Sequence, residues 1–211
     1  MKKKFKELTV NEIKKIKIGE LKKITNIIIK ENNYSILSKL NKSIIKEYLS
    51  IAINSKVIFL FVLRKNKKII GYSLFAKKTN YLINEFKTLK FKIFTNLFIK
   101  LKLISIINII LALTKIDLIL IKKKKIEDIT NSLNLNLLAI ENRYHSKGYG
   151  YFFLNKTLKL IYKNFFKFKL VSCEAPNLRA FDFYLKKCRF EYVGKKIRFG
   201  RSLFILKREY K

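Results

Sequence analysis

The chain has 211 residues, enough for one domain with a substantial hydrophobic core. Hydrophobic residues make up 49% of it and aromatic residues 14%, which excludes the composition of a disordered protein. The formal net charge of +34 would usually suggest nucleic acid or an anionic membrane as partner. Because the lysines are scattered among Ile and Asn, we attribute most of this charge to coding bias and the remainder to a cationic face that attracts anionic ligands.

Cysteine and histidine are rare in this chain. Cys173 and Cys188 are the only cysteines, and their spacing supports neither a disulfide framework nor a zinc site, so we expect buried, reduced thiols. His145 is the only histidine, which excludes a histidine-cluster metal site and any Ser-His-Asp triad built on another residue. We therefore expect no metal cofactor and no hydrolase of that kind.

The sequence shows no signal for export or membrane insertion. Residues 1–7 are basic but lack the apolar run and the small-residue cleavage site of a signal peptide. The longest uncharged stretch of the apolar middle region, residues 103–114, is shorter than the ~20 residues that a membrane-spanning helix needs. We therefore expect a cytoplasmic protein.

The N-terminal quarter predicts one strand and two helices. Residues 5–9 form the expected short strand, and Asn11 is expected to cap the helix that follows. Apolar residues at helical spacing then predict two helices within residues 13–53, separated by a break at residues 31–33.

The next segment predicts a β-hairpin followed by a helical insertion. Two β-branched and aromatic runs, residues 57–63 and 69–76, flank the turn-forming residues 64–68. From residue 81 to about residue 120 the chain is apolar and dotted with lysines, without Gly or Pro. This composition predicts one or two helices that interrupt the sheet.

The C-terminal third alternates between strands and helices. Leu and Asn alternate from residue 133, which predicts a strand over residues 133–140 that leads through Glu141 into a glycine-containing loop at residues 143–150. The elements expected after the loop are a helix with residues 154, 158, 161 and 165 on one face, a strand at 168–173, a helix at 177–188, and strands at 190–193 and 203–207.

The loop is the first feature that suggests chemistry. Backbone N–H groups at the start of a helix are unpaired and the helix dipole adds partial positive charge, so such an end binds phosphate. Gly148 and Gly150 let the backbone approach a ligand closely, and Lys147 adds charge. Two glycines alone, however, favour a plain tight turn.

A second pattern gives the loop more weight. Asn177 opens a helix directly after a strand, and Tyr184 lies on its partly apolar face, where it would otherwise be a core residue. Together the two segments resemble the GCN5-related N-acetyltransferase (GNAT) superfamily. Its glycine loop reads Q/R-x-x-G-x-G/A, which falls on residues 145–150, and its later helix carries N-x-x-A-x-x-x-Y, which falls on Asn177, Ala180 and Tyr184.

The resemblance implies a fold and a reaction. The expected fold is α/β (α+β), with a mixed, mostly antiparallel sheet of about seven strands flanked by helices. Residues 1–211 would form a single N-acetyltransferase domain, with a basic, apolar helical insertion at about residues 81–125 between strands 3 and 4. The expected reaction is transfer of an acetyl group from acetyl-CoA, as co-substrate, to a primary amine.

The resemblance also implies roles for individual residues. Tyr184 is the expected acid that protonates the departing thiolate, while an amide of the central strand stabilises the oxyanion. Glu141 is the expected base and Glu174 the second choice, with a solvated loop carboxylate as the alternative for either. The expected cofactor contacts are the backbone of Leu138, Ala139 and Ile140, which would pair with the pantetheine arm, and His145, Ser146, Lys147, Gly148, Tyr149, Gly150 and Asn177.

The chain departs from the family pattern at three places. His145 replaces the usual Arg or Gln, which would weaken a phosphate contact or make it depend on pH. The spacing from Tyr184 to Phe190 is one residue longer than in the usual Y-x-x-x-G-F pattern, and Arg189 replaces its glycine. Residues 141–142, Glu and Asn, replace a more usual Asp-Pro pair.

The acceptor amine stays open: an amino sugar of a surface polysaccharide, a protein N-terminus, a polyamine, an antibiotic and an amino acid all fit. A second hypothesis is a catalytically degenerate GNAT fold that binds a membrane surface or partner through the amphipathic insertion, whose apolar stripe includes Phe94, Leu97 and Phe98. The same stripe could instead cover the acceptor pocket or form a homodimer interface. The dispersed lysines argue against a nucleic-acid module.

Overall fold

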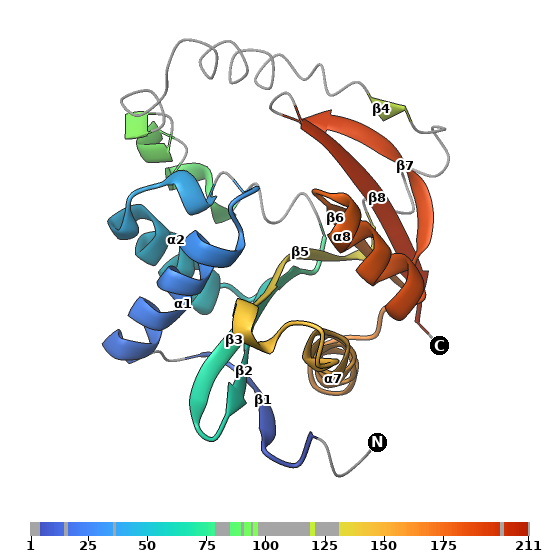
Figure 1. Cartoon of the computed structure of the whole chain (residues 1–211). Helices are drawn as coiled ribbons and strands as arrows, with labels where there is room; N and C mark the ends of the chain where they lie inside the picture. The colour runs from blue at the N-terminus through green and yellow to red at the C-terminus, as the bar shows by residue number, and fades with distance from the viewer. Residues whose placement is uncertain are drawn as a thin grey trace.

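A single mixed β-sheet lies at the centre of the molecule (Figure 1). The computed structural model describes residues 5–14, 17–35, 37–78, 85–89, 91–93, 95–96, 119–120, 131–198 and 201–210. Within these ranges the sheet has eight strands in the order β1-β2-β3-β5-β6-β8-β7-β4. Their bounds are β1 Leu8–Glu12, β2 Ile58–Lys65, β3 Lys68–Ala76, β4 Ile119–Leu120, β5 Leu133–Ile140, β6 Leu170–Ala175, β7 Glu191–Arg198 and β8 Arg201–Glu209.

Neighbouring strands run antiparallel except β5 and β6, which are parallel. The predicted fold class, a mixed and mostly antiparallel sheet flanked by helices, is therefore confirmed. The short strand β4 is the addition to the seven strands that the sequence predicted.

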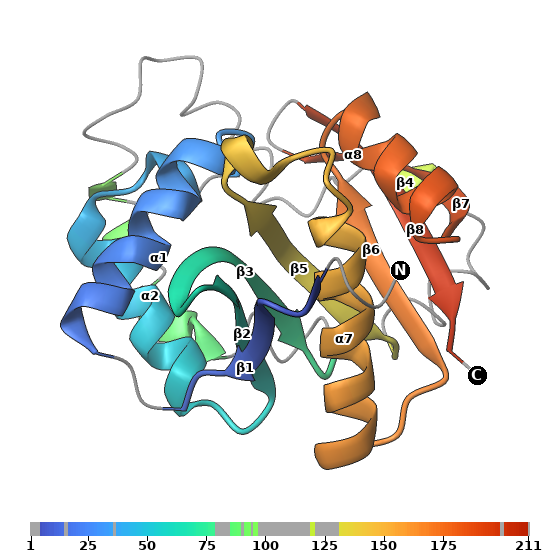
Figure 2. The same cartoon turned by 60° about the horizontal axis from the view of Figure 1, so that its bottom comes forward.

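The described helices lie on both faces of the sheet (Figures 1 and 2). None of them is long and apolar enough to cross a membrane. The α-helices are α1 Ile18–Glu31, α2 Lys42–Asn54, α7 Tyr149–Asn164 and α8 Leu178–Asp182, and α8 continues into a π-helical turn, Phe183–Lys187. Short 3₁₀ turns lie at Leu37–Lys39, Lys87–Leu89 and Asn142–Tyr144.

Two hydrophobic clusters, one on each face, bury the sheet. On β2 the side chains alternate between them: Phe59, Phe61 and Leu63 pack in the cluster with α7, and Leu60 and Val62 pack in the cluster with α1 and α2. Successive side chains of a strand point to opposite faces, so a strand covered on both faces must be apolar throughout. This explains why residues 57–63 read as an unbroken hydrophobic run.

The hairpin of β2 and β3 was predicted correctly, and its turn has a local cause. Asn66 and Lys67 connect the strands and both have positive φ, 48° and 64°. Two residues in the left-handed region give the type I′ turn, whose twist matches that of the flanking strands.

Two predictions about element boundaries were wrong. Asn11 does not cap a helix: it lies in β1 and pairs with Val62 of β2, so its backbone is committed to the sheet, and α1 begins at Ile18 after Lys17. Residues 119–120 form β4 and pair with β7, where the sequence predicted the end of a helix. The rest of the predicted insertion, residues 81–125, lies mostly outside the described ranges.

The sheet opens between β5 and β6. Their parallel register runs only from Leu133↔Val171 to Leu135↔Cys173, after which β5 stays with β3 and β6 stays with β8. Next to the divergence, the register between β3 and β5 skips Asn136, a β-bulge. Because a bulge bends its strand and increases the local twist, it helps to turn the second half of β5 away from β6.

Candidate functional site

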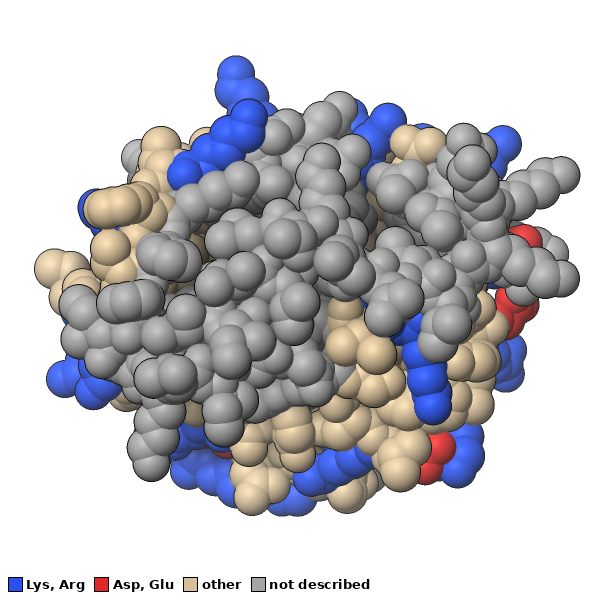
Figure 3. Space-filling model, turned by 90° about the horizontal axis from the view of Figure 1, so that it is seen from above, with Lys and Arg blue, Asp and Glu red and all other residues tan. Residues whose placement is uncertain are grey.

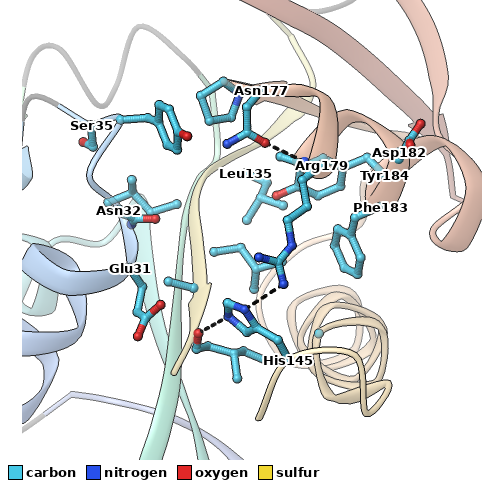
Figure 4. A pocket seen from close by; sticks show the side chains of 18 of the residues that line it. Glu31, Asn32, Ser35, Leu135, His145, Asn177, Arg179, Asp182, Phe183 and Tyr184 are labelled. Carbon is cyan, nitrogen blue, oxygen red and sulfur yellow. Dashed lines mark hydrogen bonds between the residues drawn. The ribbon is translucent and has the colours of Figure 1, made fainter. Parts of the chain in front are cut away.

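The divergence of β5 and β6 forms the floor of a cleft of about 2040 Å³. One wall is the end of α1 and the chain that follows it, including Glu31, Asn32 and Ser35. The opposite wall is the loop before α7 and the start of α8, and Figure 4 shows the two walls on either side of β5. Among the predicted site residues, those that line the cleft are Leu138, Ala139, Ile140, His145, Ser146, Gly148, Tyr149, Gly150, Glu174, Asn177 and Tyr184.

The N-terminal end of α7 opens into this cleft, and both of its glycines have a steric reason. Gly148 precedes the helix with φ 81°, a left-handed conformation that side chains other than glycine's adopt only with strain. A Cβ at Gly150 would lie 3.2 Å from ring atoms of Phe183. The first N–H groups of α7 have no partner within the helix, so this end can bind an anion.

Lys147 does not join the other loop residues in the cleft. Its ammonium donates a hydrogen bond to the carbonyl of Arg143 at 3.0 Å and lies 5.7 Å from the ring centroid of Tyr144. The charge that the sequence assigned to Lys147 is therefore turned back onto the loop.

His145 instead connects the loop to a second cation. Its Nε2–H donates to the carbonyl of Ile140 at 2.6 Å, and its Nδ1 accepts from Nη2 of Arg179 at 2.9 Å (Figure 4). A carbonyl can only accept and a guanidinium can only donate, so these two contacts select the neutral imidazole with the proton on Nε2. Arg179 also lines the cleft, and the sequence analysis did not identify it.

The start of α8 is fixed by Asn177. Its side-chain Oδ1 accepts a hydrogen bond from the N–H of Ala180 at 2.8 Å, so the residue is the N-cap of α8. The cap sets the direction in which α8 leaves β6 and presents Arg179 to the cleft. Among the described residues none accepts a hydrogen bond from the two N–H donors of the Asn177 side-chain amide, so both are available to a ligand.

Tyr184 is both a core residue and part of the cleft wall. It is 7% exposed, and its ring lies 5.1 Å from that of Phe183 and 5.4 Å from that of Phe190. Burial raises the pKa of its phenol well above the ordinary value, with the thiols of Cys173 and Cys188 adding to the effect. Tyr184 therefore stays protonated at neutral pH, as a proton donor must.

Glu141 points away from the cleft toward α1. Its carboxylate pairs with Lys23 of α1, and with Arg143 at 2.9 Å. Burial raises the pKa of this carboxyl, but hydrogen bonds from Lys23 and Arg143 outweigh burial and hold the pKa below its ordinary value. Such a group is a weak base, and Glu141 is not among the cleft-lining residues.

Three carboxylates do line the cleft: Glu31, Glu174 and Asp182, the last of which pairs with Lys186. Glu174, at the end of β6, pairs with Lys196 of β7. Glu31, at the end of α1, accepts a hydrogen bond from the backbone N–H of Asn142 at 3.0 Å. The sequence did not indicate Glu31 as a site residue, because residues 31–33 were predicted to be a break between two helices.

No protein-family model and no curated protein matches this sequence. Solved structures match its whole fold. A spermidine N-acetyltransferase from Vibrio cholerae, in complex with CoA and spermine, is 13% identical with a TM-score of 0.58, over 96% of this chain and 95% of its own. Ard1 from Thermoplasma volcanium is 12% identical with a TM-score of 0.57, over 97% and 99%. A candidate acetyltransferase of the GNAT family from Desulfovibrio desulfuricans is 8% identical with a TM-score of 0.55, over 96% and 98%. The chain has the GNAT fold.

The structure shows how α8 accommodates the one residue that this chain has in excess of the GNAT pattern between Tyr184 and Phe190. The turn Phe183–Lys187 is π-helical, and the N–H of Cys188 donates to the carbonyl of Phe183 at 3.1 Å, five residues back. A π-turn is how a helix accommodates one inserted residue. Arg189 follows with φ 58°, so it takes the left-handed position at which the Y-x-x-x-G-F pattern has glycine.

Proposed function

We propose that this protein is an acetyl-CoA-dependent N-acetyltransferase that acts on a primary amine. The observation that carries the proposal is one cleft in which the N-terminal end of α7 and Arg179 face the edge of β5 that, among the described residues, pairs with no strand beyond Leu135. A helix end and a guanidinium suit phosphates, and a free strand edge suits the amides of a pantetheine arm. The similar Vibrio cholerae structure, which contains CoA and spermine, supports CoA as the cofactor and an amine as the acceptor group.

The unpaired edge of β5 has a definite set of backbone groups. The N–H of Glu141 donates to the carbonyl of Ile70 on β3 at 2.9 Å. Because backbone groups alternate along a strand, those of Ile140 and Leu138 face the cleft and those of Ala139 face β3. His145 already donates to the Ile140 carbonyl, so Leu138 is the residue we expect to pair with pantetheine through both its N–H and its carbonyl.

The cleft residues can divide the chemistry between them. The acceptor amine attacks the thioester carbonyl, the carbon–sulfur bond breaks, and Tyr184 gives its phenolic proton to the departing thiolate. A cleft-facing amide of β5 stabilises the oxyanion. The proton of the amine passes, directly or through water, to a carboxylate that lines the cleft, Glu174 or Glu31. One of these two residues therefore replaces Glu141 as the proposed base.

The proposal is tested by comparing the wild type with Tyr184→Phe. Acetyl-CoA should raise the melting temperature of both proteins, because a ligand that binds only the folded state stabilises it. Release of the CoA thiol in the presence of primary amines should be about 100-fold slower for the variant, the usual effect of losing a general acid. Tyr192→Phe is the matched control, since Tyr192 is 46% exposed and lies outside the cleft lining.

The two readouts separate the outcomes. If neither acetyl-CoA nor CoA raises the melting temperature, the cofactor assignment is wrong. If acetyl-CoA binds but no amine is acetylated, the fold is a degenerate scaffold, as in the second hypothesis from the sequence. An amino sugar remains the acceptor that we propose. Contact of the insertion with a membrane, and a homodimer, also remain predictions because Phe94, Leu97 and Phe98 of the apolar stripe lie outside the described ranges.

A further inference from the structure

We infer that the acceptor amine belongs to a molecule that also carries an anionic group, a phosphate, and is not a polyamine. This inference rests on the proposed function and concerns the wall of the cleft opposite the loop before α7. That wall is formed by residues 30–35 at the end of α1 and by Lys39 in the following 3₁₀ turn. Figure 4 shows Glu31 and Asn32 on this side, across β5 from Arg179.

The carboxylates that line the cleft already face protein donors. Glu31 accepts from the backbone N–H of Asn142 at 3.0 Å. Glu174 pairs with Lys196, and the carboxylate of Asp182 lies 3.1 Å from the ammonium of Lys186. A polyamine would therefore have to compete with existing cationic or N–H partners for each of these carboxylates.

Two lysines of the cleft are in the opposite situation. Lys30 lines the wall at α1, and Lys187 lines the wall at the π-turn. Among the residues that the structure describes, no carboxylate lies within ion-pair distance of Lys30 or Lys187. An anionic group on the acceptor would gain a partner at either position, whereas a second ammonium group would be repelled.

Bound cofactor would not remove the preference of the cleft for an anionic acceptor. Its phosphates are expected at the end of α7, where the helix N-terminus and Arg179 offset their charge. The whole chain adds a formal charge of +34, which raises the concentration of anionic solutes near the cleft and lowers that of polycations. An amino sugar carried on a phosphate is one acceptor with the required chemistry.

The test measures binding of matched amines by calorimetry, with and without CoA. The probes are glucosamine and glucosamine 6-phosphate, ethanolamine and phosphoethanolamine, and spermidine. At least one phosphorylated amine should bind about tenfold more tightly than its unphosphorylated partner and than spermidine. Lys30→Glu should remove most of this difference, while Lys159→Glu, at an exposed position on α7 outside the cleft lining, should leave it unchanged.

Three binding results would each overturn the inference about the acceptor. Tighter or equal binding of spermidine, or binding of no phosphorylated amine in either condition, overturns the inference. The same holds if Lys159→Glu acts as strongly as Lys30→Glu, because the effect would then reflect net charge alone. Binding of the cofactor is scored separately by thermal shift, so a failure of the acceptor class is distinguishable from a failure of the proposed function.

Discussion

His145 and Arg179 form a hydrogen-bonded pair in the half of the cleft where we propose that the cofactor binds. His145 stands where the GNAT loop motif has Gln or Arg, and both of its ring nitrogens are engaged by protein atoms. The side chain that can reach a phosphate from this place is the guanidinium of Arg179, which uses one of its donors on the imidazole. Arg179 of α8 thus places a cation near the expected pyrophosphate site, although His145 stands at the motif position where Arg or Gln is usual.

We predict that Arg179→Ala weakens the binding of acetyl-CoA about tenfold to 100-fold. A hydrogen bond to a charged group contributes about 1.5–3 kcal/mol, and Arg179 can make at least one to a phosphate. Arg143→Ala is the control, because its guanidinium pairs with Glu141 outside the cleft lining. Both are measured by calorimetry with acetyl-CoA.

The double variant Arg179→Ala/His145→Arg tests whether the two positions serve the same phosphate group. It places the family's arginine at the motif position and should recover much of the affinity that Arg179→Ala loses. If Arg179→Ala binds acetyl-CoA as the wild type does, Arg179 is only a surface residue that orients His145. If the double variant recovers nothing, the two positions do not serve the same phosphate group.

At the scale of elements, the sequence predicted the central strands of the sheet well because each of them carries its own signal. The strand β5 alternates Leu and Asn, and β2 is apolar on both faces, so neither needs information from elsewhere in the chain. The prediction that Asn11 caps a helix was wrong because a cap residue can be recognised only when the start of the helix is known. Asn11 pairs with β2 as part of β1, and the helix begins later, at Ile18.

The candidate site was less predictable, for a related reason. The glycine loop, Asn177 and Tyr184 follow a local motif, and the structure gathers them in one cleft. Glu141 reads as a cleft residue from its place after β5, but its partner Lys23 is 118 positions away in sequence. An ion pair between distant segments leaves no local pattern, so the turn of Glu141 away from the cleft could not be predicted.

The π-turn after α8 leads to a prediction about stability. Arg189 has φ 58°, and a left-handed conformation costs a residue with a side chain about 1–2 kcal/mol relative to glycine. Glycine also loses about 0.5–1 kcal/mol through its greater freedom in the unfolded chain. Arg189→Gly should therefore raise the free energy of unfolding by about 0.5–1 kcal/mol, measured by urea denaturation.

The control for this variant is Lys187→Gly, two positions earlier in the π-turn. Lys187 has no positive φ, so glycine there relieves no strain and should lower the free energy of unfolding by about 1 kcal/mol. Equal destabilisation by both substitutions would mean that the left-handed turn at Arg189 is not the conformation in solution.

At the scale of the whole molecule, charge is the dominant property. On the face seen in Figure 3, Lys and Arg side chains are spread around the edge with few Asp or Glu side chains among them. The formal net charge of the chain is +34. A field of this kind acts at long range on any anionic ligand, whichever residues finally contact it.

We predict that the affinity for CoA falls steeply with salt, while the affinity for S-acetylpantetheine, which lacks the phosphates, hardly changes. Between about 0.1 M and about 1 M salt the Debye length shrinks from ~10 Å to ~3 Å, so distant lysines stop contributing and only those in contact with the phosphates remain. We expect the dissociation constant of CoA to rise at least about tenfold over this range in calorimetry. A parallel response of the two ligands would show that salt acts on the protein fold or on apolar contacts, and that the high charge of the chain plays no part in recruiting its cofactor.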